Sequence, residues 1–311
     1  MHSSKKNRII KFILFFALLI LINEFLKFAL IDDISMRNNI ARCTDNSYEM
    51  VFIGTSQLRS GLMPDVISGY ACRSVTNAAI PLSTPLDQYY FIKEICKNGE
   101  TPEYIVYECD PYYFSDGKAG GHSYAYPSGI NRIEYFISGL EQDWRSVLTP
   151  WSFQWMNYGN MPSIISKKID FIRNGYDKEY DGYSPTDAPF TAKDIVDREF
   201  TVSELSDEYM KKICEYCKEN NIKLILTQFP VAKQVYDELE PTYRNGADEY
   251  FKAISESYGF EYINCNDWSD DTFDRGYDSF VDMEGHIRVS SVGNFSVRLA
   301  ETIAEIMRAN S

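Results

Sequence analysis

The chain has 311 residues, of which 44% are hydrophobic, 24% charged and 15% aromatic, a composition that indicates a globular protein and excludes a disordered or collagen-like one. The net charge is −14, and residues 12–311 alone carry −18, because the first eleven residues hold four basic side chains and no acidic one. A body this acidic repels phosphate backbones, so no nucleic-acid partner is expected.

An apolar run follows the basic N-terminus. Residues 9–31 are long enough to cross about 30 Å of hydrocarbon as a helix. Lys5, Lys6 and Arg8 precede the run, and no small-residue cleavage site follows it, so a retained signal anchor is expected rather than a cleaved signal peptide. Residues 1–31 are therefore predicted to be a cytoplasmic tip and a single transmembrane helix. The positive-inside rule places the C-terminal domain outside the cytoplasm, attached to the plasma membrane.

After a polar stalk predicted at residues 32–47, short apolar strands alternate with longer helical segments. The expected strands are 50–53, one within 71–79, 102–111, 222–230 and 260–267, and the expected helices are 83–99, 202–220, 240–258 and 294–307. This alternation predicts an α/β protein, a three-layer α/β/α sandwich with a central, mostly parallel sheet. The domain is expected to span residues 48–311.

One long segment, residues 112–198, departs from this alternation. It is rich in aromatic residues, Gly and Pro, and it lacks a periodic pattern of its own, so it is predicted to be an insertion. We expect it to cover the carboxyl edge of the sheet, with Trp144, Trp151 and Trp155 lining or covering the site there. Aromatic faces suit sugar rings, although they equally suit ordinary packing.

Seven cysteines follow the apolar run. Seven is an odd number, and their spacing forms no disulfide framework, although some pairing outside the cytoplasm is open. Cys214 and Cys217 have CxxC spacing but fall within a helical segment, so we expect them to pack there rather than to bind a metal. No metal and no cofactor are predicted.

Two segments carry candidate chemistry. Ser56 lies in a turn of small residues directly after the first strand, where a hydroxyl is exposed and a backbone N–H faces a developing oxyanion. His286 lies near the C-terminus. Histidine is scarce in this chain, which has three in all, and one of them, His2, precedes the apolar run. An acidic residue shortly before His286 can orient its ring and stabilise the imidazolium. The two segments together indicate a nucleophile and its base.

This arrangement resembles the SGNH/GDSL hydrolase superfamily, which has a serine in a Gly-Asp/Ser/Thr-Ser turn after the first strand and an Asp…His pair before the last helix. The resemblance covers roughly residues 50–306. The chain is especially similar to the membrane-anchored branch of this superfamily. Members of that branch work beside membrane-bound O-acyltransferases in the acylation of surface polysaccharides or teichoic acids. The resemblance implies a flavodoxin-like sheet, no cofactor, and a carbohydrate or surface-polymer substrate.

The chain also departs from the family pattern. The family aspartate lies three residues before the histidine, whereas here Asp282 lies four before and Glu284 two before His286. Asp282 is the preferred orienting acid, because two apolar residues precede it and anchor it to the core. Ala79 is assigned to the place of the glycine whose N–H lines the oxyanion hole. Asp110 replaces the usual asparagine, so Asn77 is the expected side-chain donor.

The resemblance implies that His286 removes the proton of Ser56 as its oxygen attacks an ester carbonyl, with Asp282 holding the ring and the N–H groups of Ser56 and Ala79 binding the oxyanion. The predicted function is an extracytoplasmic serine esterase or O-acyltransferase acting on acyl esters, in the first place acetyl esters. Two alternatives remain, namely an inactive binding or scaffold module and a structural partner of a membrane-bound O-acyltransferase.

Overall fold

The computed structural model describes residues 2–30, 34–97, 101–115, 129–142, 157–175, 182–192, 199–269 and 271–309. Five strands form one parallel sheet in the order β2-β1-β3-β4-β5, which is the flavodoxin-like order of doubly wound folds. The strands are β1 (Met50–Ile53), β2 (Val75–Asn77), β3 (Tyr104–Glu108), β4 (Lys223–Gln228) and β5 (Glu261–Asn264). Each lies within a segment expected to be a strand, so the predicted fold class is confirmed.

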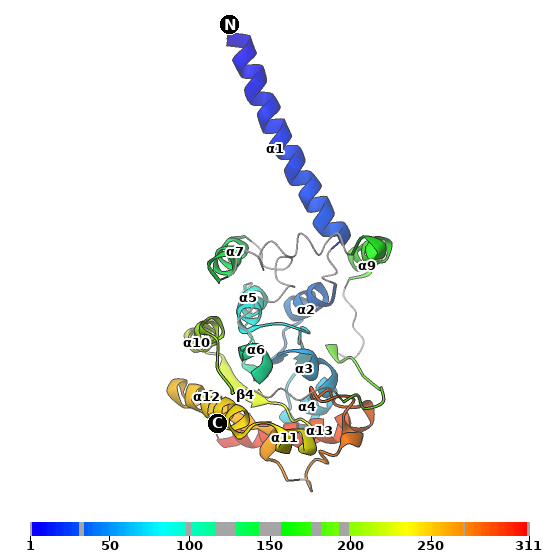
Figure 1. Cartoon of the computed structure of the whole chain (residues 1–311), viewed down its shortest axis with the longest axis vertical. Coiled ribbons are helices and arrows are strands. Elements are labelled where there is room, and N and C mark those ends of the chain that lie inside the picture. Colours follow the sequence, from blue (N-terminus) through cyan, green and yellow to red (C-terminus); the bar gives the residue numbers. More distant parts are fainter. Residues whose placement is uncertain are drawn as a thin grey trace.

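Successive side chains of the central strand enter two different cores. Val51 and Ile53 pack into one core, and Met50 and Phe52 pack into the other, because neighbouring side chains in a strand point to opposite faces. The first core is covered by α2 (Ile34–Asp45), α5 (Pro85–Ile95), α10 (Glu204–Glu219) and α12 (Pro241–Tyr258). The second is covered by α3 (Ser56–Gly61), α4 (Pro64–Ala71), α11 (Lys233–Glu238) and α13 (Val289–Ala309). The result is the predicted three-layer α/β/α sandwich (Figure 1).

Local sequence signals mark the helix ends. The Thr84 N–H donates to the Asp87 carboxylate at 2.9 Å, and Pro85 occupies the first turn of α5, as in a capping box. Helix α12 likewise starts at Pro241 and ends before Gly259, which has a φ of +74°, a left-handed conformation that glycine adopts without strain.

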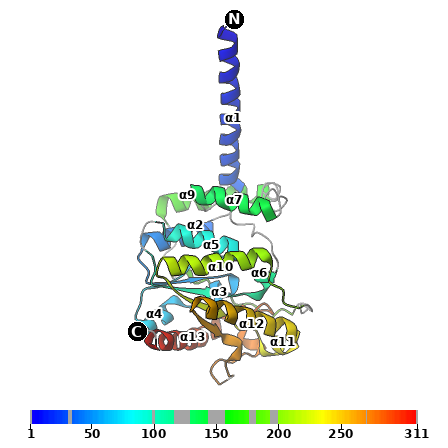
Figure 2. The ribbon, with the colours of Figure 1, turned by 90° about the vertical axis from the view of Figure 1, so that its left-hand side faces the viewer.

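Helix α1 (His2–Leu30) stands away from the body as a single rod (Figure 1, Figure 2). Its segment Asn7–Leu30 is long and apolar enough to cross a membrane, and its most apolar part is not buried against the rest of the chain. A cleavable signal sequence passes the same test of length and composition. The apolar run of the sequence is therefore a helix of membrane-spanning length.

The region expected to be a polar stalk is mostly the helix α2, which packs against the body. Met36 is part of the first core. Arg42 is buried, and its guanidinium donates to the Thr76 hydroxyl and to the Asn77 carbonyl, each at 2.9 Å. The stalk prediction differs from the structure because the polar residues of α2 find their partners on the body instead of in water.

Several helices of the insertion lie in the described ranges, namely α6 (Pro111–Ser115), α7 (Ile130–Gln142), η1 (Asn157–Asn160) and α9 (Met161–Asn174). Helices α7 and α9 lie at the same level, at the end of the body that faces α1 and across its axis (Figure 2), with α9 at the foot of α1 and α7 on the other side of the body (Figure 1). The three tryptophans expected to line the site, Trp144, Trp151 and Trp155, lie outside the described residues.

All seven cysteines are unpaired thiols within the described ranges. Cys214 and Cys217 are buried on α10 and belong to the first core, which confirms that their spacing serves helix packing. The open possibility of disulfides is not realised in this structure.

A substitution at Gly182 tests how tightly α2 packs against the body, because Gly182 lies next to Arg42 of α2. It has a φ of +93°, and an added Cβ would lie 1.9 Å from the Asn77 carbonyl oxygen and 2.3 Å from Arg42 Nη2. We predict that Gly182→Ala lowers the free energy of unfolding by about 2–4 kcal/mol, from backbone strain together with overpacking. Gly175→Ala is the matched control, since Gly175 has a φ of +80° and no atom within 4 Å of the added Cβ.

The control is expected to lose only about 1 kcal/mol, the effect of the left-handed backbone alone. Urea unfolding of the full-length protein measures both variants. Equal losses for the two substitutions would show that α2 is not tightly seated on the loop that carries Gly182.

Candidate active site

Polar side chains meet at the carboxyl edge of the sheet, where ligands bind in open α/β sheets. A cavity of about 360 Å³ lies there, and both Ser56 and His286 line it. Its walls come from the segments that follow all five strands, from α6, α11 and α12, and from the loop that carries His286. The sheet therefore brings together, in one place, residues that are up to 230 positions apart.

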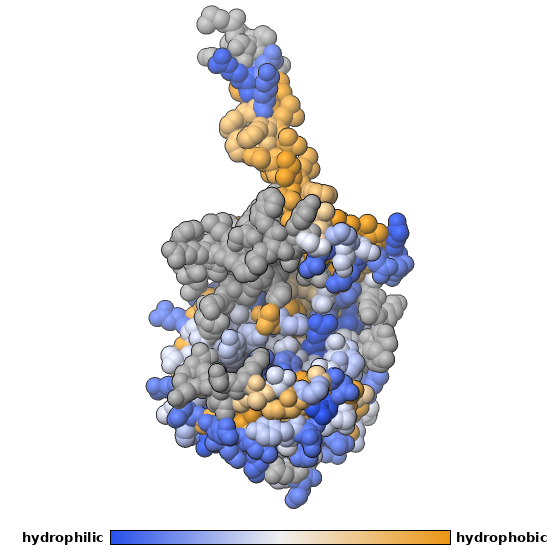
Figure 3. Space-filling view, turned by 45° about the vertical axis from the view of Figure 1, so that its right-hand side comes forward, coloured by the Kyte–Doolittle hydropathy of each residue, from blue (hydrophilic) through white to orange (hydrophobic). Residues whose placement is uncertain are grey.

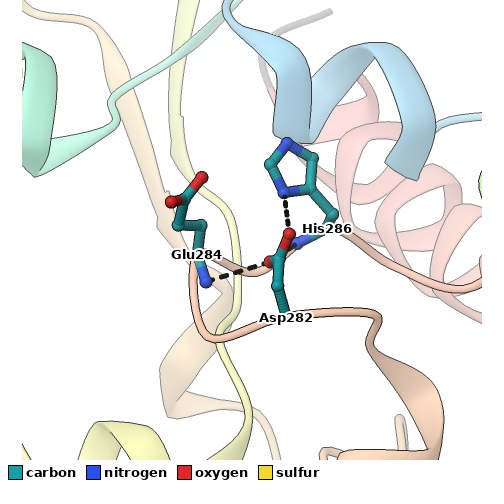
Figure 4. A group of neighbouring side chains, drawn as sticks. All are labelled: Asp282, Glu284 and His286. Carbon is teal, nitrogen blue, oxygen red and sulfur yellow. Dashed lines mark hydrogen bonds and ion pairs between the residues drawn. The ribbon is translucent and has the colours of Figure 1, made fainter. Parts of the chain in front are cut away.

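The three residues predicted as nucleophile, base and orienting acid form a chain of hydrogen bonds. His286 Nε2 lies 2.8 Å from Ser56 Oγ. On the other side of the ring, His286 Nδ1 lies 2.8 Å from Asp282 Oδ2, as Figure 4 shows. With a proton on Nδ1, that nitrogen donates to Asp282 and Nε2 accepts from the Ser56 hydroxyl. This is the arrangement in which a serine is activated by a base held by an acid.

The loop 280–287 folds so that Asp282 and His286 face each other. The Val281 N–H donates to the His286 carbonyl at 3.0 Å, which closes the loop. Asp282 Oδ1 accepts the N–H of Glu284 at 3.0 Å and that of His286 at 3.3 Å. Gly285 has a φ of +92° at the close approach of this loop to Pro230, which a residue with a side chain adopts only under strain.

The pKa values of the pair move in opposite directions. Burial lowers the pKa of His286, but the hydrogen bond and the charge of Asp282 outweigh burial, so the pKa is raised above the ordinary 6.5. Burial raises the pKa of Asp282, but the hydrogen bond and the charge of His286 outweigh it, and that pKa is lowered. Asp282 is therefore ionised at neutral pH, which suits it to stabilise an imidazolium.

Glu284, the other acid near His286, does not serve the ring. Its side chain is exposed, and Figure 4 shows its carboxylate to one side of the imidazole, while the hydrogen bond of the ring runs to Asp282. Asp282, Glu284 and His286 offer ligand atoms within 4.8 Å of one another. Both ring nitrogens of His286 already face Ser56 and Asp282, so neither has a lone pair open to a cation, and we assign no metal to this group.

A buried carboxyl group supports the turn that presents Ser56. Glu108, the last residue of β3, accepts the N–H of Thr55 and, at 3.1 Å, the N–H of Leu58. Gly54 makes room for it, since a Cβ there would lie 2.3 Å from Glu108 Oε2. Burial and the charge of Asp110 raise the pKa of Glu108 to about 8. Glu108 thus holds the turn in place through hydrogen bonds to backbone N–H groups at the start of α3.

Asp110, which stands where the SGNH/GDSL pattern has an asparagine, lines the same cavity. Its Oδ1 accepts the Tyr112 N–H at 3.0 Å. Burial raises the pKa of Asp110 to about 6, against the opposing effects of that hydrogen bond and of the nearby charge of His286. Above that pH its carboxylate has no proton to donate.

The two predicted oxyanion donors besides Ser56 are engaged elsewhere. The Ala79 N–H donates to Asn77 Oδ1 at 3.1 Å, and the Asn77 amide donates to the Leu58 carbonyl at 2.8 Å. Both residues are buried. The assignment of Ala79 and Asn77 is therefore corrected, because Asn77 ties the end of β2 to α3 instead of facing the cavity.

Leu82 is a cavity residue that sequence reasoning missed. Pro81 and Leu82 are the central residues of a turn closed by the Ser83 N–H, which donates to the Ile80 carbonyl at 3.2 Å. Leu82 has a φ of +61° and is 56% exposed, which is a strained conformation for a large side chain. Proline followed by a position that needs a positive φ is a turn signal, but a leucine in the place of the usual glycine conceals it.

No family model matches this chain, and no curated protein matches it. Among solved structures, it is similar to a candidate acylhydrolase from Bacteroides fragilis and to a GDSL-like lipase from Bacteroides thetaiotaomicron. Each is 12% identical, with 83% of this chain and 88% of the other covered, and the TM-scores are 0.40 and 0.37. The class of this protein, a flavodoxin-like α/β protein with a Ser–His–Asp constellation, is defined by its own strand order and side-chain geometry.

The pKa of His286 tests which acid holds its ring. We predict that Asp282→Asn lowers this pKa strongly, since it removes the hydrogen bond to an ionised acceptor and its charge. Glu284→Gln should lower it less, because Glu284 acts only through its more distant charge. NMR titration of the histidine ring protons measures both variants. A larger decrease in Glu284→Gln than in Asp282→Asn would reverse the assignment.

Proposed function

We propose that this protein is a serine hydrolase or acyltransferase of the SGNH/GDSL type that acts on acyl esters. The observation that carries the proposal is the hydrogen-bonded chain from Ser56 Oγ through His286 to Asp282, with two distances of 2.8 Å. Ser56 and His286 line a cavity that is large enough for a small ligand. The sequence motif and the geometry support the same three residues.

In the proposed reaction, His286 Nε2 takes the Ser56 proton as the serine oxygen bonds to the ester carbonyl carbon. The imidazolium then gives this proton to the departing alcohol, which leaves an acyl group on Ser56. Water or a sugar hydroxyl then attacks the acyl carbon while His286 takes its proton. The imidazolium gives this proton to the Ser56 oxygen as the acyl–serine bond breaks, so the acyl group ends on the attacking oxygen. Asp282 stays ionised throughout and stabilises the imidazolium.

Backbone N–H groups are the proposed oxyanion donors. Helix α3 begins at Ser56, so the first N–H groups of that helix lack partners within it and its positive end faces the developing charge. Leu82 lines the same cavity as Ser56 and has a strained backbone. We assign the second donor to the Leu82 N–H, in place of Ala79. Losing one such donor typically costs about 3–4 kcal/mol of barrier.

The proposal extends to location and natural substrate. The basic residues before α1 support a single-pass protein whose N-terminus is cytoplasmic and whose body lies outside the plasma membrane. The resemblance to the membrane-anchored branch supports a cell-surface polysaccharide or related polymer as the acyl donor or acceptor. It also supports a membrane-bound O-acyltransferase as a partner. Hydrolysis and transfer then differ only in whether water or a polymer hydroxyl receives the acyl group.

Asp110 favours one alternative function. An ionised carboxylate beside Ser56 opposes the negative charge of a tetrahedral intermediate, and its pKa of about 6 leaves it mostly ionised at neutral pH. This supports an inactive module that binds or scaffolds a surface polymer. Whether Ser56 reacts with an acylating or phosphonylating reagent distinguishes this alternative from the enzyme.

Reaction with a fluorophosphonate probe tests the proposed nucleophile. We predict that the wild type is labelled and that Ser56→Ala is not, whereas Ser60→Ala, on the same helix, is labelled like the wild type. Labelling should slow as the pH falls through the pKa of His286, because the protonated ring cannot accept the serine proton. With an ester substrate, Asp282→Asn should lower kcat by about 10⁴-fold. An unlabelled wild type would support the inactive alternative.

The volume and the lining of the cavity indicate how long an acyl group it can hold. A cavity of about 150 Å³ holds benzene, so about 360 Å³ holds considerably more than the acetyl group expected from the sequence. Its lining combines polar side chains, among them Gln228, Arg244 and Asn266, with apolar ones, namely Phe229, Val231, Val235, Leu239 and Ala247. The apolar part of this lining suits a hydrocarbon chain. We propose an acyl group of about six to ten carbons.

Leu239 tests the length of the acyl group, because it is half-buried and lines this cavity. We predict that the wild type prefers an octanoyl to an acetyl nitrophenyl ester by at least about tenfold in kcat/KM, since each buried methylene contributes about 0.8 kcal/mol. Leu239→Trp should lower octanoyl turnover by about tenfold and leave acetyl turnover within about twofold. Glu238→Trp, exposed and outside the cavity, is the control. A wild type that prefers acetyl esters would contradict the proposed chain length but not the serine mechanism.

A further inference from the structure

Two helices of the insertion carry an unusual set of exposed side chains. In the described part of the chain, all exposed isoleucines outside α1 lie on α7 and α9. These are Ile130, Ile133 and Ile137 on α7, with exposed fractions of 65%, 56% and 47%, and Ile169 and Ile172 on α9, with 38% and 71%. Spacings of three and four residues place them on one face of each helix.

The inward face of α7 makes hydrogen bonds to the body around a single aromatic ring, that of Tyr135, which belongs to the first core. The Asn131 amide donates to Glu94 at 2.8 Å, and the Tyr135 hydroxyl donates to Asp87 at 3.0 Å. On the same side, Ser138 Oγ accepts the Tyr209 hydroxyl at 2.6 Å. A helix on the surface of a water-soluble protein has the reverse pattern, with its apolar face toward the core and its polar face toward water. The outer face of α7 therefore suits an apolar environment.

Both helices lie at the end of the body that faces α1, with α9 against the foot of α1 and α7 on the other side of the body (Figure 1). Lys168 of α9 is buried, and its ammonium group lies 5.3 Å from the centre of the Phe28 ring. Phe28 is near the end of the segment Asn7–Leu30 that is apolar enough to cross a membrane. Figure 2 shows α7 and α9 lying across the axis of α1 at this level. Apolar colouring continues in Figure 3 from the lower part of α1 onto the adjoining edge of the body.

Charge also distinguishes α9 from the rest of the body. The helix carries Lys167, Lys168 and Arg173 against one acid, Asp170, whereas residues 12–311 as a whole carry −18. Basic residues flanking an apolar stripe are typical of helices that lie in the interface of a bilayer with anionic lipids.

We propose that α7 and α9 lie in the interface of the same bilayer that α1 crosses, with their exposed isoleucines in contact with lipid chains. The occupant of this face is thus a lipid surface, and the body rests on the membrane through three helices. This inference depends on α1 being a retained membrane anchor, as proposed above, but not on the chemistry of Ser56. A consequence is that the catalytic cavity keeps a constant orientation relative to the bilayer.

Nitroxide labels on the full-length protein test this contact. Cys72, the exposed cysteine, is first replaced by serine, and single labels are then attached at Ile133→Cys and at Ile172→Cys. Val289→Cys is the control, because Val289 is 41% exposed at the start of α13, in the layer away from the foot of α1. The protein is reconstituted in phosphatidylcholine vesicles that contain phosphatidylglycerol. EPR power saturation then compares collisions with oxygen, which partitions into lipid, and with a water-soluble nickel chelate.

We expect a ratio of oxygen to nickel accessibility at least about threefold higher at residues 133 and 172 than at residue 289. Equal ratios at the three positions would overturn the proposal and would indicate a protein partner on this face. Protein that does not float with the vesicles would also overturn it, since α1 would then be no anchor. Both results leave the proposed serine chemistry intact, because fluorophosphonate labelling of Ser56 in the same samples measures that separately.

Discussion

The carboxyl group of Glu108 lies under the turn that carries Ser56, and most of the candidate site depends on that contact. It accepts the N–H groups of Thr55 and Leu58, and it occupies the space that a side chain at Gly54 would need. These bonds connect the ends of β1 and β3, which are neighbours in the sheet. A carboxyl group buried in this way is costly unless its oxygens are satisfied, so the turn and the acid stabilise each other.

The site is assembled from opposite ends of the chain onto that turn. The Gln57 side chain donates to the carbonyl of Glu284, which ties helix α3 directly to the loop that carries His286. Asp282 accepts two backbone N–H groups as well as the ring of His286, so its orientation is determined before any substrate arrives. Such preorganisation is what lets fixed groups stabilise a developing charge without reorganising. Asp110 is an exception, because at neutral pH its carboxylate is mostly ionised and would oppose a developing negative charge.

The insertion gives the fold a second apolar surface, on the side of helix α1. Its helices α7 and α9 direct hydrogen-bonding or buried side chains toward the protein and isoleucines outward. A body joined to a bilayer by one helix can rotate about it, whereas one held by three helices cannot. For an enzyme that acts on a polymer near the membrane surface, a constant orientation keeps the cavity at a constant distance from its substrate. The anchor and the insertion therefore form one functional unit in the proposed arrangement.

Local patterns in the sequence determined the sheet, the long helices, and Ser56, Asp282 and His286 as a group. Apolar runs between turn signals predict buried strands, and the scarcity of histidine leaves few candidates for a base. The remaining features depend on contacts between distant segments. Asn77 bonds to a carbonyl of α3 instead of facing the cavity, Leu82 takes a backbone conformation usual for glycine, and α2 buries an arginine in the body. Only the tertiary structure decided these, because each depends on which hydrogen-bond partner or free space another part of the chain supplies.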